Sequence, residues 1–307
     1  MIARVHPSKL FGALLLVSLL FSSQLARAQH IQQGPKLVGS GAVGSAEQGY
    51  AVALSADGNT AIVGGPFDNS QAGAAWAFTR SGGVWTQQGA KLVGTGAAVG
   101  NANQGNSVAL SADGNTAIVG GPNDGAAWVF TRSNGVWTQQ GAKLVGTGAV
   151  GGALQGISVA LSADGNTAIV GGAGDNSNIG AVWVFTRSGG VWTQQGSKLV
   201  GTGAVGNARQ GISVALSADG NTAIVGGNGD NSNTGAAWVF TPSGGVWSQQ
   251  GNKLVGTGAT LGAQGKSVAV SADGNTAIVG GISTTSTPGR RGSGPGAAVS
   301  GPSRATS

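Results

Sequence analysis

The stretch "SADGNTAIVGG" at residues 55–65 determines how this chain is interpreted, because the same eleven residues return four more times. The further copies lie at 111–121, 162–172, 217–227 and 271–281. Between the aspartates of successive copies the steps are 56, 51, 55 and 54 residues. A repeat of about fifty residues is typical of a solenoid, a propeller or another array of stacked units.

Each unit contains four candidate β-strands. The first two, "SVALS" and "TAIVGG", are joined by "ADGN", and Asp-Gly between apolar runs predicts a type I′ hairpin with positive φ at both central residues. The third and fourth, "AAWVFTR" and "VWTQQGAKL", are joined by "SGG" or "SNG". Pairing places Val52, Leu54, Ala61 and Val63 on one face of the first hairpin, and it places Arg80 over the ring of Trp85. Both faces of the first hairpin are small or apolar, which favours a sheet covered on both sides.

The repeat predicts an all-β fold, a β-propeller of about five four-stranded blades. The expected blade repeats are about 50–93, 107–145, 158–200, 213–255 and 267–281. Residues 31–38, "IQQGPKLV", match the fourth strand of the other copies, so we expect them to complete the last blade and close the ring. An open linear stack with two bare ends is the alternative.

The two ends of the chain differ from the repeat body at 29–281. Residues 1–28 combine a basic start, the apolar stretch "LFGALLLVSLLF" and "ARA" at 26–28, which predicts a signal peptide. We therefore expect an exported protein, periplasmic, cell-surface or extracellular; a membrane anchor would need about 20 apolar residues. Residues 282–307 are rich in Gly, Ser, Pro and Arg and are expected to be a disordered tail. A truncated or frame-shifted end would look the same.

Composition narrows the classes of partner. The chain is glycine-rich, with 60 Gly in 307 residues, and it has no cysteine, which excludes disulfides and thiolate metal sites. Its formal charge of +6 is carried by the two ends, since residues 29–281 hold ten basic and ten acidic side chains. A neutral body predicts neither a nucleic acid nor an anionic membrane as partner.

The strings "QGxSVALSADGNTAIVGG" and "GAAWVFTRSGGVWTQQGAKL" resemble the bacterial FG-GAP repeat family, which is related to the integrin α-subunit propeller, over residues 31–281. The phenylalanine of "FG" is replaced by Gln48, Gln104, Gln155, Gln210 and Gln264. "GAP" reads "GGP" at 64–66 and 120–122 and loses its proline elsewhere. The resemblance implies a secreted or surface propeller that binds other molecules. The family's calcium loop is replaced here by "ADGN", which cannot supply six to eight oxygens, so no calcium or other cofactor is expected.

The acidic residues favour structure over catalysis. Five recur in the "ADGN" turn and are interpreted as turn-structural: Asp57, Asp113, Asp164, Asp219 and Asp273. Four recur in the next loop, at Asp68, Asp124, Asp175 and Asp230, and Glu47 is the tenth. Nine equivalent carboxylates argue against one acid/base pair, and the only histidine after residue 28 is His30. We do not expect an enzyme.

Two sets of residues are candidates for ligand binding. The loops "DNSNIG" and "DNSNTG", which begin at Asp175 and Asp230, could hold a cation or a sugar, or they could be plain Asx-turn connectors. The second set is the tryptophans: Trp76, Trp85, Trp128, Trp137, Trp183, Trp192, Trp238 and Trp247. These could line pockets between blades or fill the space there.

The sequence thus predicts an exported, non-enzymatic FG-GAP-like repeat protein that binds an unidentified protein or glycan through its loops. A carbohydrate-binding lectin propeller with tryptophan pockets is the first alternative. A structural cell-envelope or matrix protein is the second, and a hydrolase has the least support.

Overall fold

The computed structural model describes residues 32–98, 100–257, 262–282 and 297–300. The chain divides into two units, Met1–Pro35 and Lys36–Ser307. In the first unit, residues 32–35 carry no helix or strand. The predicted signal peptide at 1–28 lies outside the described residues. Within the described part of the chain, no helix has the length and apolar character needed to cross a membrane.

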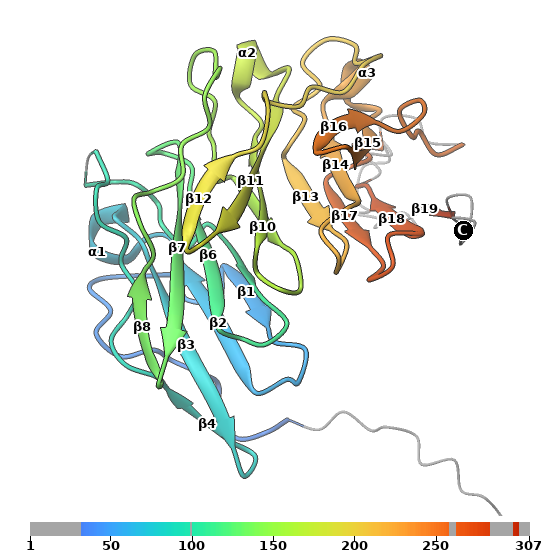
Figure 1. Ribbon diagram of the computed structural model, residues 1–307. Coiled ribbons are helices and arrows are strands. Elements are labelled where there is room, and N and C mark those ends of the chain that lie inside the picture. The colour runs from blue at the N-terminus through green and yellow to red at the C-terminus, as the bar shows by residue number, and fades with distance from the viewer. Residues whose placement is uncertain (1–31, 99, 258–261, 283–296, 301–307) are drawn as a thin grey trace, which may run out of the picture. The chain divides into compact units, whose positions relative to one another are not determined.

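The second unit consists of antiparallel sheets, each built from consecutive strands (Figure 1). The first sheet contains β1 (Ala51–Leu54), β2 (Thr60–Gly65), β3 (Ala74–Ser81) and β4 (Val84–Gln87). The second contains β5 (Ser107–Leu110), β6 (Thr116–Gly121), β7 (Ala126–Ser133) and β8 (Val136–Gln139). The third contains β9 (Ser158–Leu161), β10 (Thr167–Gly172), β11 (Ala181–Ser188) and β12 (Val191–Gln194). The fourth contains β13 (Ser213–Leu216), β14 (Ala223–Gly227), β15 (Ala236–Ser243) and β16 (Val246–Gln249).

The last sheet contains three described strands, β17 (Ser267–Val270), β18 (Thr276–Gly280) and β19 (Ala297–Ser300). The all-β fold with a four-stranded repeat is therefore confirmed. The predicted strand faces are also confirmed, since Val52 pairs with Val63 and Leu54 with Ala61. Arg80 pairs with Trp85, and its Cζ lies 5.7 Å from the ring centroid.

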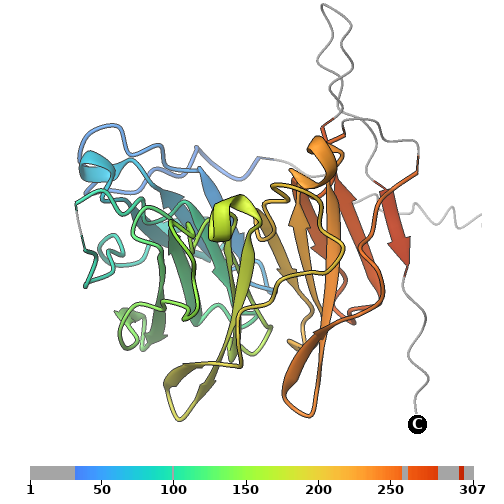
Figure 2. The ribbon, with the colours of Figure 1, turned by 90° about the horizontal axis from the view of Figure 1, so that it is seen from above.

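Successive sheets pack face to face in the order of the sequence (Figures 1 and 2). The core between the first two sheets combines Ile62 and Ala77 of the first with Val119, Trp128 and Phe130 of the second. The next two pairs of sheets form equivalent cores. Turns link the sheets as well: the Ala56 N–H donates to the Ala112 carbonyl, 2.9 Å away. Both faces of the repeated hairpin are thus used, which explains why both are small or apolar.

The "ADGN" turn differs from the type I′ prediction. The Gly58 N–H donates to the Ser55 carbonyl at 2.9 Å, and Gly58 has a φ of +67°. Asp57 is not among the residues with positive φ, so the type I′ prediction is wrong. The Asp57 carboxylate accepts from the Ser55 hydroxyl at 2.5 Å and from the Asn59 N–H at 2.9 Å, and these bonds select a turn with one left-handed residue.

The two ends of the repeat body only partly follow the predicted ring closure. Leu37 packs against the core of the first sheet, but residues 32–38 form no strand, and the last sheet has no described fourth strand. The segment 282–307, expected to be disordered, contributes β19, so that expectation does not hold for Ala297–Ser300. The remainder of that segment, 283–296 and 301–307, lies outside the described residues. "GAAVS" at 296–300 is a short form of the "GAAWVF" of earlier copies, and this similarity could have predicted a third strand there.

Apolar side chains remain exposed on the first and last sheets. Val52 of the first sheet is 70% exposed. In the last sheet Ile278 is 51% exposed, whereas its four counterparts, Ile62, Ile118, Ile169 and Ile224, are fully buried. Among the described residues, these two sheets each have one neighbouring sheet rather than two.

Candidate binding surface at the loop end

The two ends of each sheet carry different connections. One end, here called the loop end, carries the segment leading into the first strand and the turn between the second and third strands. Three of these turns are α1 (Asp68–Gln71), α2 (Asp175–Asn178) and α3 (Asp230–Asn233). The opposite end, here called the far end, carries the "ADGN" turns and the hairpins at 81–83, 133–135, 188–190 and 243–245.

The turns α1, α2 and α3 are left-handed along most of their length. In α2 the φ values of Asn176, Ser177 and Asn178 are +48°, +56° and +68°. A left-handed conformation costs roughly 1–2 kcal/mol for a residue with a side chain, although asparagine tolerates it better than most. The conformation therefore needs support from the rest of the fold.

Asp175 provides that support. Its Oδ1 accepts from the Val150 N–H at 2.7 Å, and its Oδ2 is paired with the Lys198 ammonium. The side chain of Asp175 is only 1% exposed. The equivalent pairs are Asp68 with Lys91, Asp124 with Lys143 and Asp230 with Lys253. The candidate ligand residues Asp175 and Asp230 are thus enclosed by internal partners.

Four of the eight candidate tryptophans lie on third strands and are fully buried: Trp76, Trp128, Trp183 and Trp238. The indole N–H of Trp183 donates to the Thr147 carbonyl at 2.8 Å, and the other three make the same bond to residues 40, 95 and 202. In this structure these rings have no face available to a ligand.

The other four tryptophans lie on fourth strands, and three of them, Trp137, Trp192 and Trp247, connect neighbouring sheets. The indole N–H of Trp137 donates to Oε1 of Gln88 in the preceding sheet at 3.0 Å, and Arg132 covers the ring with its Cζ 5.5 Å from the centroid. Trp192 is held in the same way by Gln140 and Arg187, and Trp247 by Gln195. Trp85 is half-buried under Arg80. All eight indoles therefore have a packing role.

The repeated glutamine before each first strand forms a clamp within the loop end. Oε1 of Gln104 accepts from the Gly94 N–H at 2.5 Å, while its Nε2 donates to the Gly94 carbonyl at 2.9 Å. Gln48, Gln155, Gln210 and Gln264 bind the equivalent glycines in the same way. Each clamp thereby closes a loop within the segment that leads into the first strand.

The residue before this glutamine is different in every copy. It is Glu47, Asn103, Leu154, Arg209 and Ala263 in turn. All five have a positive φ, between +43° and +57°. The Arg209 N–H donates to the Asn178 carbonyl of the preceding sheet at 2.8 Å, so the left-handed turn of one sheet positions the variable residue of the next. Our sequence interpretation missed this position, which a column-by-column comparison of the copies would have found.

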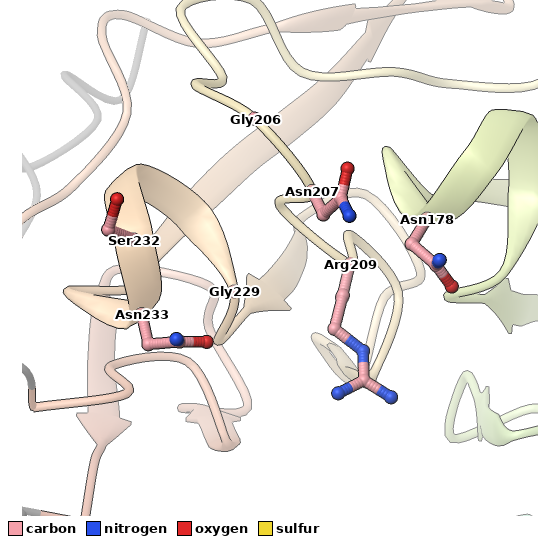
Figure 3. A pocket seen from close by; sticks show the side chains of 7 residues that line it. All are labelled: Asn178, Gly206, Asn207, Arg209, Gly229, Ser232 and Asn233. Carbon is pink, nitrogen blue, oxygen red and sulfur yellow. The ribbon is translucent and has the colours of Figure 1, made fainter.

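An open pocket of about 640 Å³ surrounds one of these variable residues. Its lining consists of Asn178, Gly206, Asn207, Arg209, Gly229, Ser232 and Asn233 (Figure 3). Asn178 comes from α2 of the third sheet, while Ser232 and Asn233 come from α3 of the fourth. Arg209 lies between them in Figure 3.

The repeated aspartates of the far end serve their own turns. The pKa of Asp57 and of Asp273 is lowered, first by the hydrogen bond from Ser55 or Ser271 and then by those from Asn59 or Asn275. For Asp113 and Asp164, burial favours a higher pKa, but the serine and asparagine hydrogen bonds and the nearby arginine outweigh it and lower the pKa. In the described part of the chain, no group of three or more His, Cys, Asp or Glu side chains could hold a metal ion.

No protein-family model and no curated protein matches the sequence. Solved structures do match. Hydrazine synthase of Kuenenia stuttgartiensis is similar at a TM-score of 0.50 and 14% identity, over 85% of this chain and 62% of its own. A functionally unknown protein from Desulfotomaculum acetoxidans is similar at a TM-score of 0.51 and 13% identity, over 82% of this chain and 75% of its own. A protein from Lactobacillus plantarum is similar at a TM-score of 0.51 and 17% identity, over 76% of this chain and 64% of its own. These neighbours are β-propeller-like, and the chain shares with them an all-β, propeller-like fold.

Proposed function

We propose that the chain is an exported, non-enzymatic binding protein of the FG-GAP type, which holds a protein or a glycan at its loop end. The observation that carries this proposal is the distribution of differences between the copies. The strands and far-end turns are nearly identical, whereas the left-handed position before the clamp glutamine differs in all five copies. Its side chain is exposed in three of them, at Glu47, Leu154 and Arg209. Variation on a fixed scaffold is typical of a surface that recognises a partner.

The acidic side chains, which could serve as catalytic acids or bases, mostly have internal partners in this chain. This supports a binding role. Asp57 and its four counterparts bond their own turns, and Asp175 and its three counterparts are paired with lysines. Glu47 is then the one acidic side chain of the described residues outside these two repeated sets. An acid/base pair in distinct environments is not formed by such a set.

A ring of five blades is also part of the proposal. Leu37 contacts the first sheet as Leu92 contacts the second, which supports residues 31–38 as the segment that completes the last blade. The first and last sheets each leave one apolar face exposed, and this supports the same idea. At the junctions between the first four sheets, two such faces pack against each other, so the two exposed faces could pack together and close the ring.

The loop end is tested by a glycan-array screen of the full chain with two variants. The first carries Glu47→Ala and Arg209→Ala, each of which places at a left-handed position the alanine that the fifth copy has as Ala263. The control is Asn134→Gly at the far end, where three other copies have glycine. Both should fold like the original chain. We expect the array signal to fall in the first variant and to persist in the control; equal signals from all three chains would refute the loop end as the binding surface.

A further inference from the structure

The junction between the third and fourth sheets differs from the other junctions because its pocket contains a positively charged side chain, that of Arg209. The variable positions at the other described junctions are Asn103, Leu154 and Ala263, none of which is charged. Between the second and third sheets the turn is also shorter, because "PNDG" at 122–125 lacks the three left-handed residues of α2. The chemistry of the Arg209 pocket is therefore not repeated elsewhere in the described residues.

The backbone of Arg209 is held by hydrogen bonds, whereas its side chain is exposed to solvent. Its N–H donates to the Asn178 carbonyl at 2.8 Å, its carbonyl accepts from the Ile212 N–H at 3.1 Å, and its φ is +57°. The side chain is exposed, and within the described residues it has no acidic partner. Asp230, the carboxylate of the turn α3 that lines the pocket, is paired with Lys253 and bonded to the Val205 N–H. The guanidinium therefore keeps its donors for a ligand.

The rest of the lining is polar and neutral. Asn178, Asn207 and Asn233 offer amide donors and acceptors, Ser232 offers a hydroxyl, and the two glycines add no side chain (Figure 3). The lining has no aromatic ring and no aliphatic side chain. It therefore suits a ligand rich in hydroxyl groups better than a peptide, whose apolar side chains would find no partner here.

We propose that this pocket binds the carboxylate of a uronic acid residue in an acidic saccharide, with Arg209 as its anchor. A guanidinium matches the two oxygens of a carboxylate through parallel hydrogen bonds, and such charge-assisted bonds are stronger than neutral ones. The asparagine and serine side chains then bond the sugar hydroxyls. This inference rests on the proposed function and names the class of ligand for the same loop end.

The test is calorimetric titration of the full chain with trigalacturonate, and with neutral trigalactose as the matched ligand. We expect the acidic trisaccharide to bind with a Kd of about 1 mM or below, to weaken at high salt because the contact is ionic, and the neutral one to bind at least tenfold more weakly.

Arg209→Asn is the matched variant, since Asn103 occupies the equivalent left-handed position and asparagine tolerates that conformation. We expect it to melt like the original chain and to bind trigalacturonate at least tenfold more weakly, which corresponds to about 1.4 kcal/mol. Arg209→Lys, which keeps the charge but loses the planar fork, should fall between the two.

Equal affinities for the acidic and neutral trisaccharides, or for the original chain and Arg209→Asn, would overturn the proposal. Binding of an acetylated aspartyl peptide without binding of trigalacturonate would overturn it in favour of a peptide carboxylate. Such a result leaves the loop end itself standing if the array signal still depends on Glu47 and Arg209. If trigalacturonate binding depends on Arg209 but the array signals of the original chain and the two array variants are equal, the uronate site stands. That result rejects only the proposal that the loop end holds the ligands found on the array.

Discussion

The Asp175 carboxylate joins three parts of the chain, since it accepts a backbone N–H before the third sheet, starts the left-handed turn and pairs with Lys198 after the sheet. The sequence interpretation left the role of this aspartate open between ligand and connector. Its enclosure depends on a lysine 23 residues away, which no local pattern reveals.

Exchanging either partner of this pair should destabilise the fold to a different degree. Lys198→Met leaves a carboxylate that is 1% exposed without its cation, and we expect a loss of about 3 kcal/mol. Asp175→Asn leaves a lysine that is 19% exposed and can reach water, so a smaller loss of about 1–2 kcal/mol is expected. Urea unfolding of both single variants and the double variant measures this; a larger loss for Asp175→Asn would contradict the assignment.

Replacing the tryptophans of the third strands should lower the stability of the fold rather than remove ligand binding directly. Trp183 is fully buried and hydrogen-bonded, so Trp183→Ala should cost about 3–5 kcal/mol. Trp192 on the fourth strand is only half-buried, and its replacement by alanine should cost less. Thermal melting checks the order of the two. A Trp183→Ala chain that melts normally but loses glycan binding would revive the lectin alternative.

At the scale of the element, the hairpins could be predicted well because each copy repeats the same period-two pattern. The faces followed from it, and so did the approximate bounds of the first three strands. The fourth strand, expected to extend over "VWTQQGAKL", ends at Gln87. The type of turn did not, since the sequence rule for Asp-Gly considers the backbone, whereas here the Asp57 carboxylate bonds Ser55 and Asn59 and keeps its own residue out of the left-handed region. The strand β19 was missed because the 16 residues between it and β18 have the composition of a loop.

These turns make stability depend on pH in the acid range. The pKa of Asp164 is lowered in the folded chain, so its hydrogen bonds stabilise the fold above the unfolded pKa of about 3.9 and are lost as the pH falls through the folded value. We expect Asp164→Asn to melt below the original chain at pH 7, with the difference shrinking toward pH 2. Thermal melts across this range measure it. A difference that is the same at pH 2 and pH 7 would show that the carboxylate charge plays no part.

At the scale of the whole molecule, repetition predicted a propeller-like fold, but it could not predict the candidate site. Repetition identifies what the copies share, and the pocket is lined where they differ, at Arg209 and Asn207. The left-handed position of Arg209 also depends on a turn of the preceding sheet, more than thirty residues earlier in the chain.

Closure of the ring predicts that the exposed face of the last sheet is covered in solution. Ile278→Ser should then destabilise the chain by about 2 kcal/mol, approaching the loss for the buried Ile224→Ser. If Ile278 stays half exposed, its replacement should change stability by less than about 0.5 kcal/mol. Urea unfolding distinguishes the two, and a midpoint that rises with protein concentration would show instead that a second chain covers the face.

The measurement that tests the central claim most directly is amide hydrogen exchange of the full chain with and without trigalacturonate, or with a stronger ligand found on the array. The account predicts added protection at 176–179, 205–212 and 229–235, which line and support the Arg209 pocket, and no change at the far-end hairpin 188–190. Protection confined to the far end, or spread over the strand faces, would contradict a binding surface at the loop end.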